Sequence, residues 1–128
     1  RPETAWFWLS CNFWDANGQR VGLNLASGVN ESFGNENCLW VNGALYAVAD
    51  VLFVKQDNQH WTITSLDQKL NLTIETGWRR FESLNLRLVG SQFSQWQSRV
   101  SGTIQTEQGE IIHLNREYGL LEQHYAKW

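Results

Sequence analysis

Proline, cysteine and methionine are scarce in this sequence, which has one proline, two cysteines and no methionine. The two cysteines, Cys11 and Cys38, are too few for the disulfide framework of a small secreted domain. They would form one bridge in a secreted protein, but we expect two buried thiols in a reducing compartment, the cytoplasm. No apolar run approaches the roughly 20 residues of a membrane-spanning helix, so we expect no membrane span.

Clustered positive charge and catalytic motifs are also missing. The ten Lys and Arg residues are scattered over a chain of net charge −3, whereas nucleic-acid binding needs a clustered basic face, so we expect no nucleic-acid partner. There is no Gly-x-Ser-x-Gly elbow, no Cys-x-x-Cys or His-Glu-x-x-His pattern and no glycine-rich phosphate loop. Glu122, His124 and His113 could meet on strands, but ordinary surface hydrogen bonds explain them more simply than a metal does. We therefore predict no metal, nucleotide, haem or flavin.

Tryptophan, in contrast, is abundant, with eight residues among 128. Hydrophobic residues make up 42% of the chain and charged residues 18%, which is typical of one folded domain spanning residues 1–128. A tryptophan side chain buries a large apolar area, and its N–H requires a partner. The composition therefore fits either a tryptophan-filled β core, the commoner case, or an aromatic-lined cavity.

Two-residue alternation separated by turn signals predicts an antiparallel all-β fold, a barrel or strongly curved sheet of about nine strands. Asn17-Gly18 and Asn42-Gly43 are typical of tight hairpin turns. Residues 92–97 are polar and read as a loop, and residues 118–128 as a short helix or a last strand. The expected strands are 5–15, 20–25, 37–41, 45–55, 61–65, 70–75, 82–90, 96–106 and 110–114.

The first expected strand has two largely apolar faces. A two-residue turn at Asn17-Gly18 would place Trp14 opposite Val21 and Asn12 opposite Leu23. A strand at the protein surface would show one polar face, so we expect this strand to be covered on both sides. Its first face carries Trp6, Trp8, Ser10, Asn12 and Trp14, and its second carries Phe7, Leu9, Cys11 and Phe13.

Several stretches resemble a bacterial family known as domain of unknown function 2804, in its C-terminal half. They are residues 6–8 (WFW), 22–25 (GLNL), 36–43 (ENCLWVNG), 100–102 (VSG) and 122–128 (EQHYAKW). The family's usual ending has an acidic residue where this chain has Gln123. More distantly, the chain is similar to the second half of double-lipocalin proteins, a group that includes carotenoid hydratases. This resemblance implies a lipocalin-like barrel, apolar ligands and an N-terminal domain of the same protein as partner, which agrees with the absence of an initiator methionine.

Polar residues among the aromatic ones are the best candidates for a ligand site. Ser10 and Asn12 alternate with tryptophans, and buried polar groups need hydrogen-bond partners, which another strand, water or a ligand could supply. Glu36 and Glu122 lie in resembling stretches beside aromatic residues, where a dry pocket would raise the pKa of a carboxyl group and make it a proton donor. Bonds to turn amides or basic side chains are the alternative for both. The predicted ligand-binding residues are Trp6, Trp8, Ser10, Asn12, Trp14, Asn24 and Trp40.

Three functions follow from these observations. The first is a binding module that holds an apolar small molecule, a lipid or isoprenoid, in an aromatic-lined cavity. The second is a structural half that packs on an N-terminal β-domain. The third is a non-redox lyase or isomerase that uses Glu36 or Glu122 as the acid on an isoprenoid-like substrate.

Overall fold

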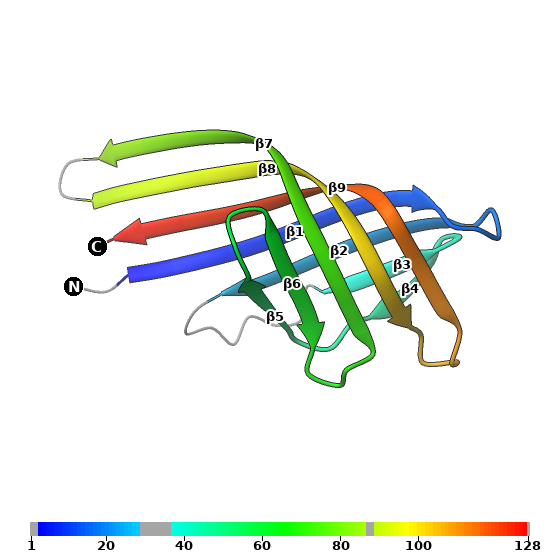
Figure 1. The fold of residues 1–128 in the computed structure, drawn as a ribbon. Coiled ribbons are helices and arrows are strands. Elements are labelled where there is room, and N and C mark those ends of the chain that lie inside the picture. The colour runs from blue at the N-terminus through cyan, green and yellow to red at the C-terminus, as the bar shows by residue number, and fades with distance from the viewer. Residues whose placement is uncertain (1–2, 29–36, 87–88, 128) are drawn as a thin grey trace.

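The computed structural model describes residues 3–28, 37–86 and 89–127, which form one antiparallel sheet of nine strands (Figure 1). The all-β prediction is therefore confirmed. The strands are β1 (Glu3–Trp14), β2 (Arg20–Gly28), β3 (Cys38–Val41), β4 (Ala44–Ala47), β5 (Val51–Lys55), β6 (His60–Ser65), β7 (Leu70–Leu86), β8 (Val89–Gln105) and β9 (Ile111–Lys127).

Three predictions about individual segments are wrong. Residues 92–97, expected as a loop, lie inside β8, and the expected strand 45–55 is divided between β4 and β5 at opposite edges of the sheet. For the tail, the strand alternative is confirmed and the helix alternative is wrong, because residues 118–127 are the second half of β9. The expected strand 82–90 is divided between the end of β7 and the start of β8. No helix that could span a membrane occurs in the ranges that the structure describes.

The strand order is β4-β3-β2-β1-β9-β8-β7-β6-β5, so β4 and β5 are the edge strands. The sheet curls until β5 contacts β2 near the opposite edge, and the ring of Phe53 on β5 stacks on Phe7 of β1 at 5.6 Å. This curl makes a half-barrel with an inner and an outer face. Buried apolar side chains fill its interior, and the largest fully buried ones are Leu9, Leu25, Leu39, Ile63, Leu70, Ile74, Ile112, Leu121, Val100 and Cys11.

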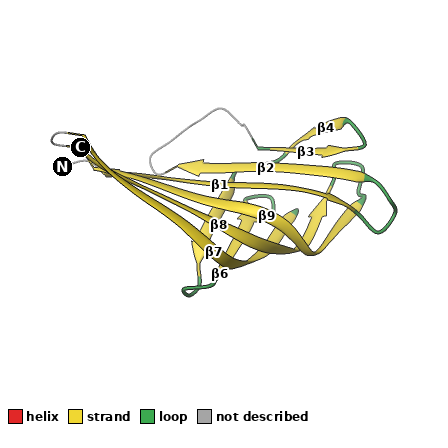
Figure 2. Ribbon diagram, turned by 90° about the horizontal axis from the view of Figure 1, so that it is seen from above, coloured by secondary structure: helices red, strands yellow, loops and turns green. Residues whose placement is uncertain are grey.

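The sheet has two regions, which we call the body and the extension. The body is the half-barrel itself. The extension consists of the far ends of four neighbouring strands, residues 3–8, 80–86, 89–95 and 122–127, which project beyond the half-barrel (Figures 1 and 2). Within these ranges, Phe7 still packs on Phe53 and Trp61 of the half-barrel. The β6 strand pairs with β7 only as far as Glu75. The two regions therefore share strands but differ in what lies across from them.

Local irregularities mark the bend of the three long strands, β7, β8 and β9. The pairing of β7 with β8 shifts between Thr76 and Arg79, and that of β8 with β9 shifts at Val100/Gly102. Gly102 has φ +138°, and a Cβ there would lie 2.1 Å from the carbonyl oxygen of Asn71. Only glycine fits this close approach, because any side chain would collide with the neighbouring backbone.

The first hairpin differs from its prediction by one residue. Val21 pairs with Phe13, whereas the expected partner was Trp14. The carboxylate of Asp15 accepts hydrogen bonds from the amides of Asn17 and Gln19 at 2.9 and 2.8 Å, and this wider turn has Gly18 at φ +75°. A one-residue change of register moves side chains to the opposite face. The valine and leucines of β2 consequently share the inner face with Phe13 and its neighbours.

Candidate functional site

The predicted ligand-binding residues lie together on the outer face of the sheet. Alternation along β1 points Leu9 and Cys11 inward, so Trp8, Ser10, Asn12 and Trp14 point outward. Pairing places Asn24 of β2 beside Ser10, and Trp40 of β3 in the same row as Asn12. The expected grouping of these side chains exists, but it is not enclosed: Trp8, Trp14 and Trp40 are 46%, 66% and 40% exposed. The expectation that β1 is covered on both sides does not hold for the part of the chain that the structure describes.

A groove lies at the β1–β2–β3 end of this face. Its volume is about 630 Å³, and it is lined by Asn12, Arg20, Gly22, Trp40, Asn42 and Gly43. Gly22 is closely covered, because a Cβ at this position would lie 2.9 Å from Oδ1 of Asn12 and 3.4 Å from Cε3 of Trp40. The absence of a side chain at Gly22 therefore lets the amide of Asn12 and the indole ring of Trp40, two of the predicted ligand-binding residues, approach each other over the β2 backbone in the groove lining.

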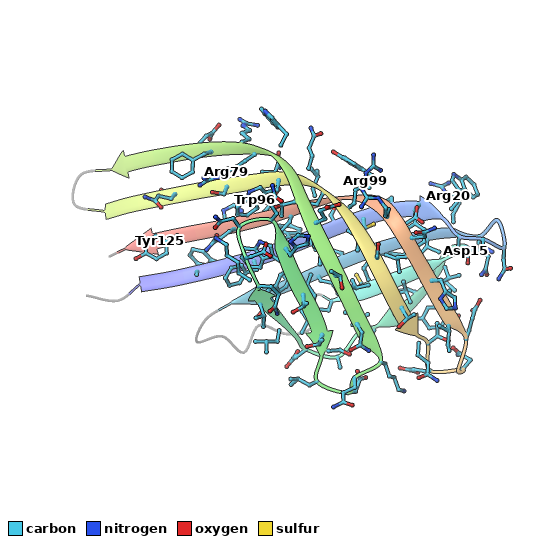
Figure 3. The ribbon with its side chains drawn as sticks, in the orientation of Figure 1. Asp15, Arg20, Arg79, Trp96, Arg99 and Tyr125 are labelled. Atoms are coloured by element: carbon cyan, nitrogen blue, oxygen red, sulfur yellow. The ribbon has the colours of Figure 1, made fainter. Side chains whose placement is uncertain are left out.

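The walls of this groove are held by turn hydrogen bonds. The two-residue turn after β3 has Asn42 at φ +50° and Gly43 at φ +85°, as its Asn-Gly sequence predicts. Oδ1 of Asn42 accepts the backbone N–H of Arg20 at 3.0 Å. The Arg20 guanidinium lies 5.6 Å from the centre of the Trp14 ring, and Figure 3 shows Arg20 near the turn that contains Asp15. The groove thus combines one exposed indole face with amide and guanidinium donors at its edge.

The remaining predicted residues lie outside the groove lining. Nε1 of Trp8 donates a hydrogen bond of 2.7 Å to Oδ1 of Asn24, which fixes both side chains on the outer face. Trp6 is half-buried and pairs with His124 of β9, in the extension. Ser10 is half-buried and lies on the same face. These residues occupy the part of the outer face that runs from the groove to the extension.

Glu122, the predicted proton donor, lies on the outer face opposite Trp8. Its carboxylate accepts a hydrogen bond from Nε2 of Gln95 at 2.8 Å, and its other oxygen lies 3.1 Å from Nε2 of His124. Its partners are therefore polar side chains, whereas the two predicted alternatives were a dry aromatic pocket and a bond to a basic side chain. Glu36 lies outside the described residues. Within the described ranges, no group of three or more His, Cys, Asp or Glu side chains could hold a metal ion.

The family model described as "Domain of unknown function (DUF2804)" matches residues 1–128. The chain belongs to this family. The comparisons with curated proteins and with solved structures returned no significant match. Because the match to the DUF2804 family covers the whole sequence, both the body and the extension belong to the family's domain.

The sequence did not predict two other features of this DUF2804 domain. On the inner face, the Arg79 guanidinium lies 4.6 Å from the centre of the Phe81 ring and 5.7 Å from that of Trp96, and it donates to Oγ of Ser94 (Figure 3). On the outer face, a second pocket lies at the bend and has Arg99 in its wall. Both depend on the register between neighbouring long strands, and spacing along the chain gave no signal for either.

Proposed function

We propose that this DUF2804 domain is a binding module that holds a small, largely apolar molecule in the outer groove. The observation that carries the proposal is the groove itself, in whose lining the indole of Trp40 and the amide of Asn12 lie on either side of Gly22. Ligand sites are concave, are lined by aromatic surface with a few polar groups, and commonly have volumes of about 300–1,000 Å³. The groove has each of these properties, and its volume of about 630 Å³ lies within that range.

The chemistry of the lining indicates what kind of molecule fits. A flat apolar face can pack on the exposed Trp40 ring, and each 100 Å² of apolar area removed from water contributes about 2.5 kcal/mol. The Asn12 amide can both donate and accept hydrogen bonds, and the Arg20 guanidinium only donates. Hydroxyl or keto groups at the edge of the ligand match these partners. Isoprenoid alcohols and ketones combine both features, and isoprenoids are the class that the double-lipocalin resemblance implies.

Titration of tryptophan fluorescence with fatty acids, isoprenoid alcohols and carotenoids tests this proposal. We expect Trp40→Ala to weaken binding of the responding ligand by about tenfold or more, because the packing surface is removed. Leu52→Ala is the control, since Leu52 is an exposed apolar residue on β5 that lines neither the groove nor the second pocket. Gly22→Ala should also weaken binding, because its Cβ would displace the Asn12 amide or the Trp40 ring from the groove lining. The proposal fails if no ligand produces a response, or if the Trp40 and Leu52 variants bind equally well.

A second candidate function is the structural half that packs on an N-terminal β-domain. The extension favours it, because aromatic side chains are exposed on both of its faces: Trp8 on the outer face and Phe81, at 48%, on the inner one. Such a surface predicts self-association or binding of a hydrophobic dye. Sedimentation that shows a monodisperse monomer without dye binding would refute this candidate.

The enzyme alternative depends on Glu122 in the described part of the chain. A lyase or isomerase that uses this carboxyl group as its acid should lose turnover of an isoprenoid substrate in Glu122→Gln. We rank it last, because Gln95 and His124 already engage both carboxylate oxygens.

A further inference from the structure

The second pocket lies on the outer face at the bend of the three long strands. Its volume is about 320 Å³, and it shares no lining residue with the groove. Glu75 of β7, Arg99 of β8 and Tyr118 of β9 stand directly opposite one another in its wall. Trp78 and Gln59 also line it. Figure 3 shows Arg99 beside the bend.

The acidic groups around this pocket already have partners. An oxygen of Glu75 accepts a hydrogen bond of 2.6 Å from Nη1 of Arg116, and its other oxygen lies 4.0 Å from Nε2 of His60. The hydrogen bond and positive charge of Arg116 hold the pKa of Glu75 below its ordinary value. The carboxylate of Asp57 lies 2.9 Å from Nδ1 of His60. Arg99 has no hydrogen bond, ion pair or ring contact with any residue that the structure describes, so it is the cation left unneutralised in the pocket wall.

Backbone irregularities shape this pocket. Arg116 is a non-glycine residue at φ +51°, and Oγ of Ser101 accepts its amide hydrogen at 3.0 Å. A Cβ at Gly77 would lie 2.9 Å from the carbonyl oxygen of Gln97, so the strands approach closely there. Residues are held in sparsely populated conformations only where the surrounding structure enforces them, and such strain and bulges are concentrated at functional sites. The strained turn places the Arg116 side chain across β8, where it reaches Glu75 on β7.

Aromatic side chains supply the rest of the surface. Trp78 is 65% exposed and Tyr118 is 46% exposed, and both line the pocket that contains Arg99. An arginine presents a planar fork of N–H donors that matches the two oxygens of a carboxylate or phosphate. An exposed ring next to such a fork offers a packing surface for the carbon part of the same ligand.

We propose that the bend pocket binds the oxyanion, a carboxylate or phosphate, of a small aromatic or apolar molecule. Arg99 makes the bidentate contact with the oxyanion, and Trp78 and Tyr118 pack on the ring. Arg116 offsets the charge of Glu75, which would otherwise repel the anion. This site is separate from the groove, and it requires nothing of the ligand bound there.

The probes are phenyl phosphate, benzoate, inorganic phosphate and the uncharged benzyl alcohol, each titrated into the whole chain and followed by amide NMR shifts and calorimetry. We expect phenyl phosphate or benzoate to bind with shifts concentrated at residues 97–99 and 116–118, and benzyl alcohol to bind at least about tenfold more weakly. Inorganic phosphate binding as tightly as phenyl phosphate would overturn the role of the rings. Shifts confined to other residues, or no saturable binding of either organic anion, would overturn the site.

Two variants separate Arg99 from general surface charge. Arg99→Gln should weaken phenyl phosphate binding by about tenfold, and Arg99→Lys by less, because lysine keeps the charge but loses the fork. Arg80→Gln is the matched control, since Arg80 is an exposed arginine paired with Glu82 outside the pocket. Equal weakening by Arg80→Gln and Arg99→Gln would contradict the proposal, as would unchanged binding to Arg99→Gln. If the Arg99 variants do not fold, the shift map of the unmodified chain decides.

Discussion

The body and the extension are built from the same strands, yet only the body has a closed core. On β7, Ile74 in the body is fully buried, whereas Phe81 in the extension is about half exposed, although both side chains are on the inner face. The difference lies in the opposite wall, because β5 and β6 curl over the body, and β6 pairs with β7 only as far as Glu75. Burial in this domain is therefore decided by which strands lie across the interior.

The largest effect should come from the body, where β8 passes close to β7 at Gly102. Gly102→Ala places a Cβ 2.1 Å from the Asn71 carbonyl oxygen in a backbone that already has φ +138°. We expect a loss of about 4 kcal/mol or failure to fold, because both backbone strain and overpacking oppose the change. Urea unfolding followed by circular dichroism measures the loss.

The matched control for this change is Gly109→Ala. Gly109 also has positive φ, +86°, but a Cβ there would meet nothing within 4 Å. Its substitution should therefore cost only about 1 kcal/mol, the cost of the backbone conformation alone. Similar losses for the two variants would mean that the close approach of β8 to β7 adds nothing to the cost of the backbone conformation.

A second pair of variants compares the two regions along one strand. Ile74→Ala should lower the free energy of unfolding by about 3 kcal/mol, because it leaves a cavity in a packed core. Phe81→Ala removes more atoms but should cost only about 1 kcal/mol, since the ring is exposed and loses mainly its contact with Arg79. A loss for Phe81→Ala as large as that for Ile74→Ala would show that the extension has a covering that the described residues do not supply.

The sequence predicted the body better than the extension for a physical reason. In the body, one face of the sheet is buried, so apolar residues alternate with polar ones along β6 and the first half of β7. The sequence pattern therefore predicted both strands. In the extension, the segment that contains Gln92, Ser94 and Gln95 shows no alternation of apolar and polar residues. The reason is that no strand of the described sheet curls over this segment. Pairing with β7 and β9 holds this segment as strand. The local pattern of residues 92–97 does not reveal that pairing, because it depends on the register with residues outside the segment, on β7 and on β9.

For the candidate sites too, the sequence predicted what lies along one strand but not what the pairing of strands brings together. The grouping of Trp8, Asn12 and Trp14 follows from alternation along one strand and was predicted. Which β2 side chains share their face depended on the length of the first turn. The Asp15 carboxylate holds a loop that is one residue wider than predicted. The bend pocket joins Glu75, Arg99 and Arg116, which only the shifted pairing of three strands brings together.

Cys11 tests how tightly the body is closed next to the bend. Its thiol donates to the carbonyl oxygen of Tyr118 at 3.1 Å, and burial, followed by the charge of Glu117, raises the pKa of Cys11 from 9.0 to about 12. At pH 8 we therefore expect iodoacetamide to modify the half-buried Cys38 faster than Cys11, with both reacting in urea. Fast labelling of Cys11 in the folded protein would mean that the body opens locally at this strand.

The same thiol predicts a dependence of stability on pH. Below pH 9 both states keep the proton, so the Cys11 contribution is fully present. Above pH 9 the unfolded thiol ionises while the buried one does not, so stability falls as the pH rises toward 12. The loss is at most about 1.4 kcal/mol per pH unit. Other groups also titrate here, so the measurement is the difference in urea unfolding between the unmodified chain and Cys11→Ala from pH 8 to 10.5. Parallel pH curves for the two proteins would contradict a closed body, because they would mean that Cys11 ionises equally easily in the folded and unfolded states.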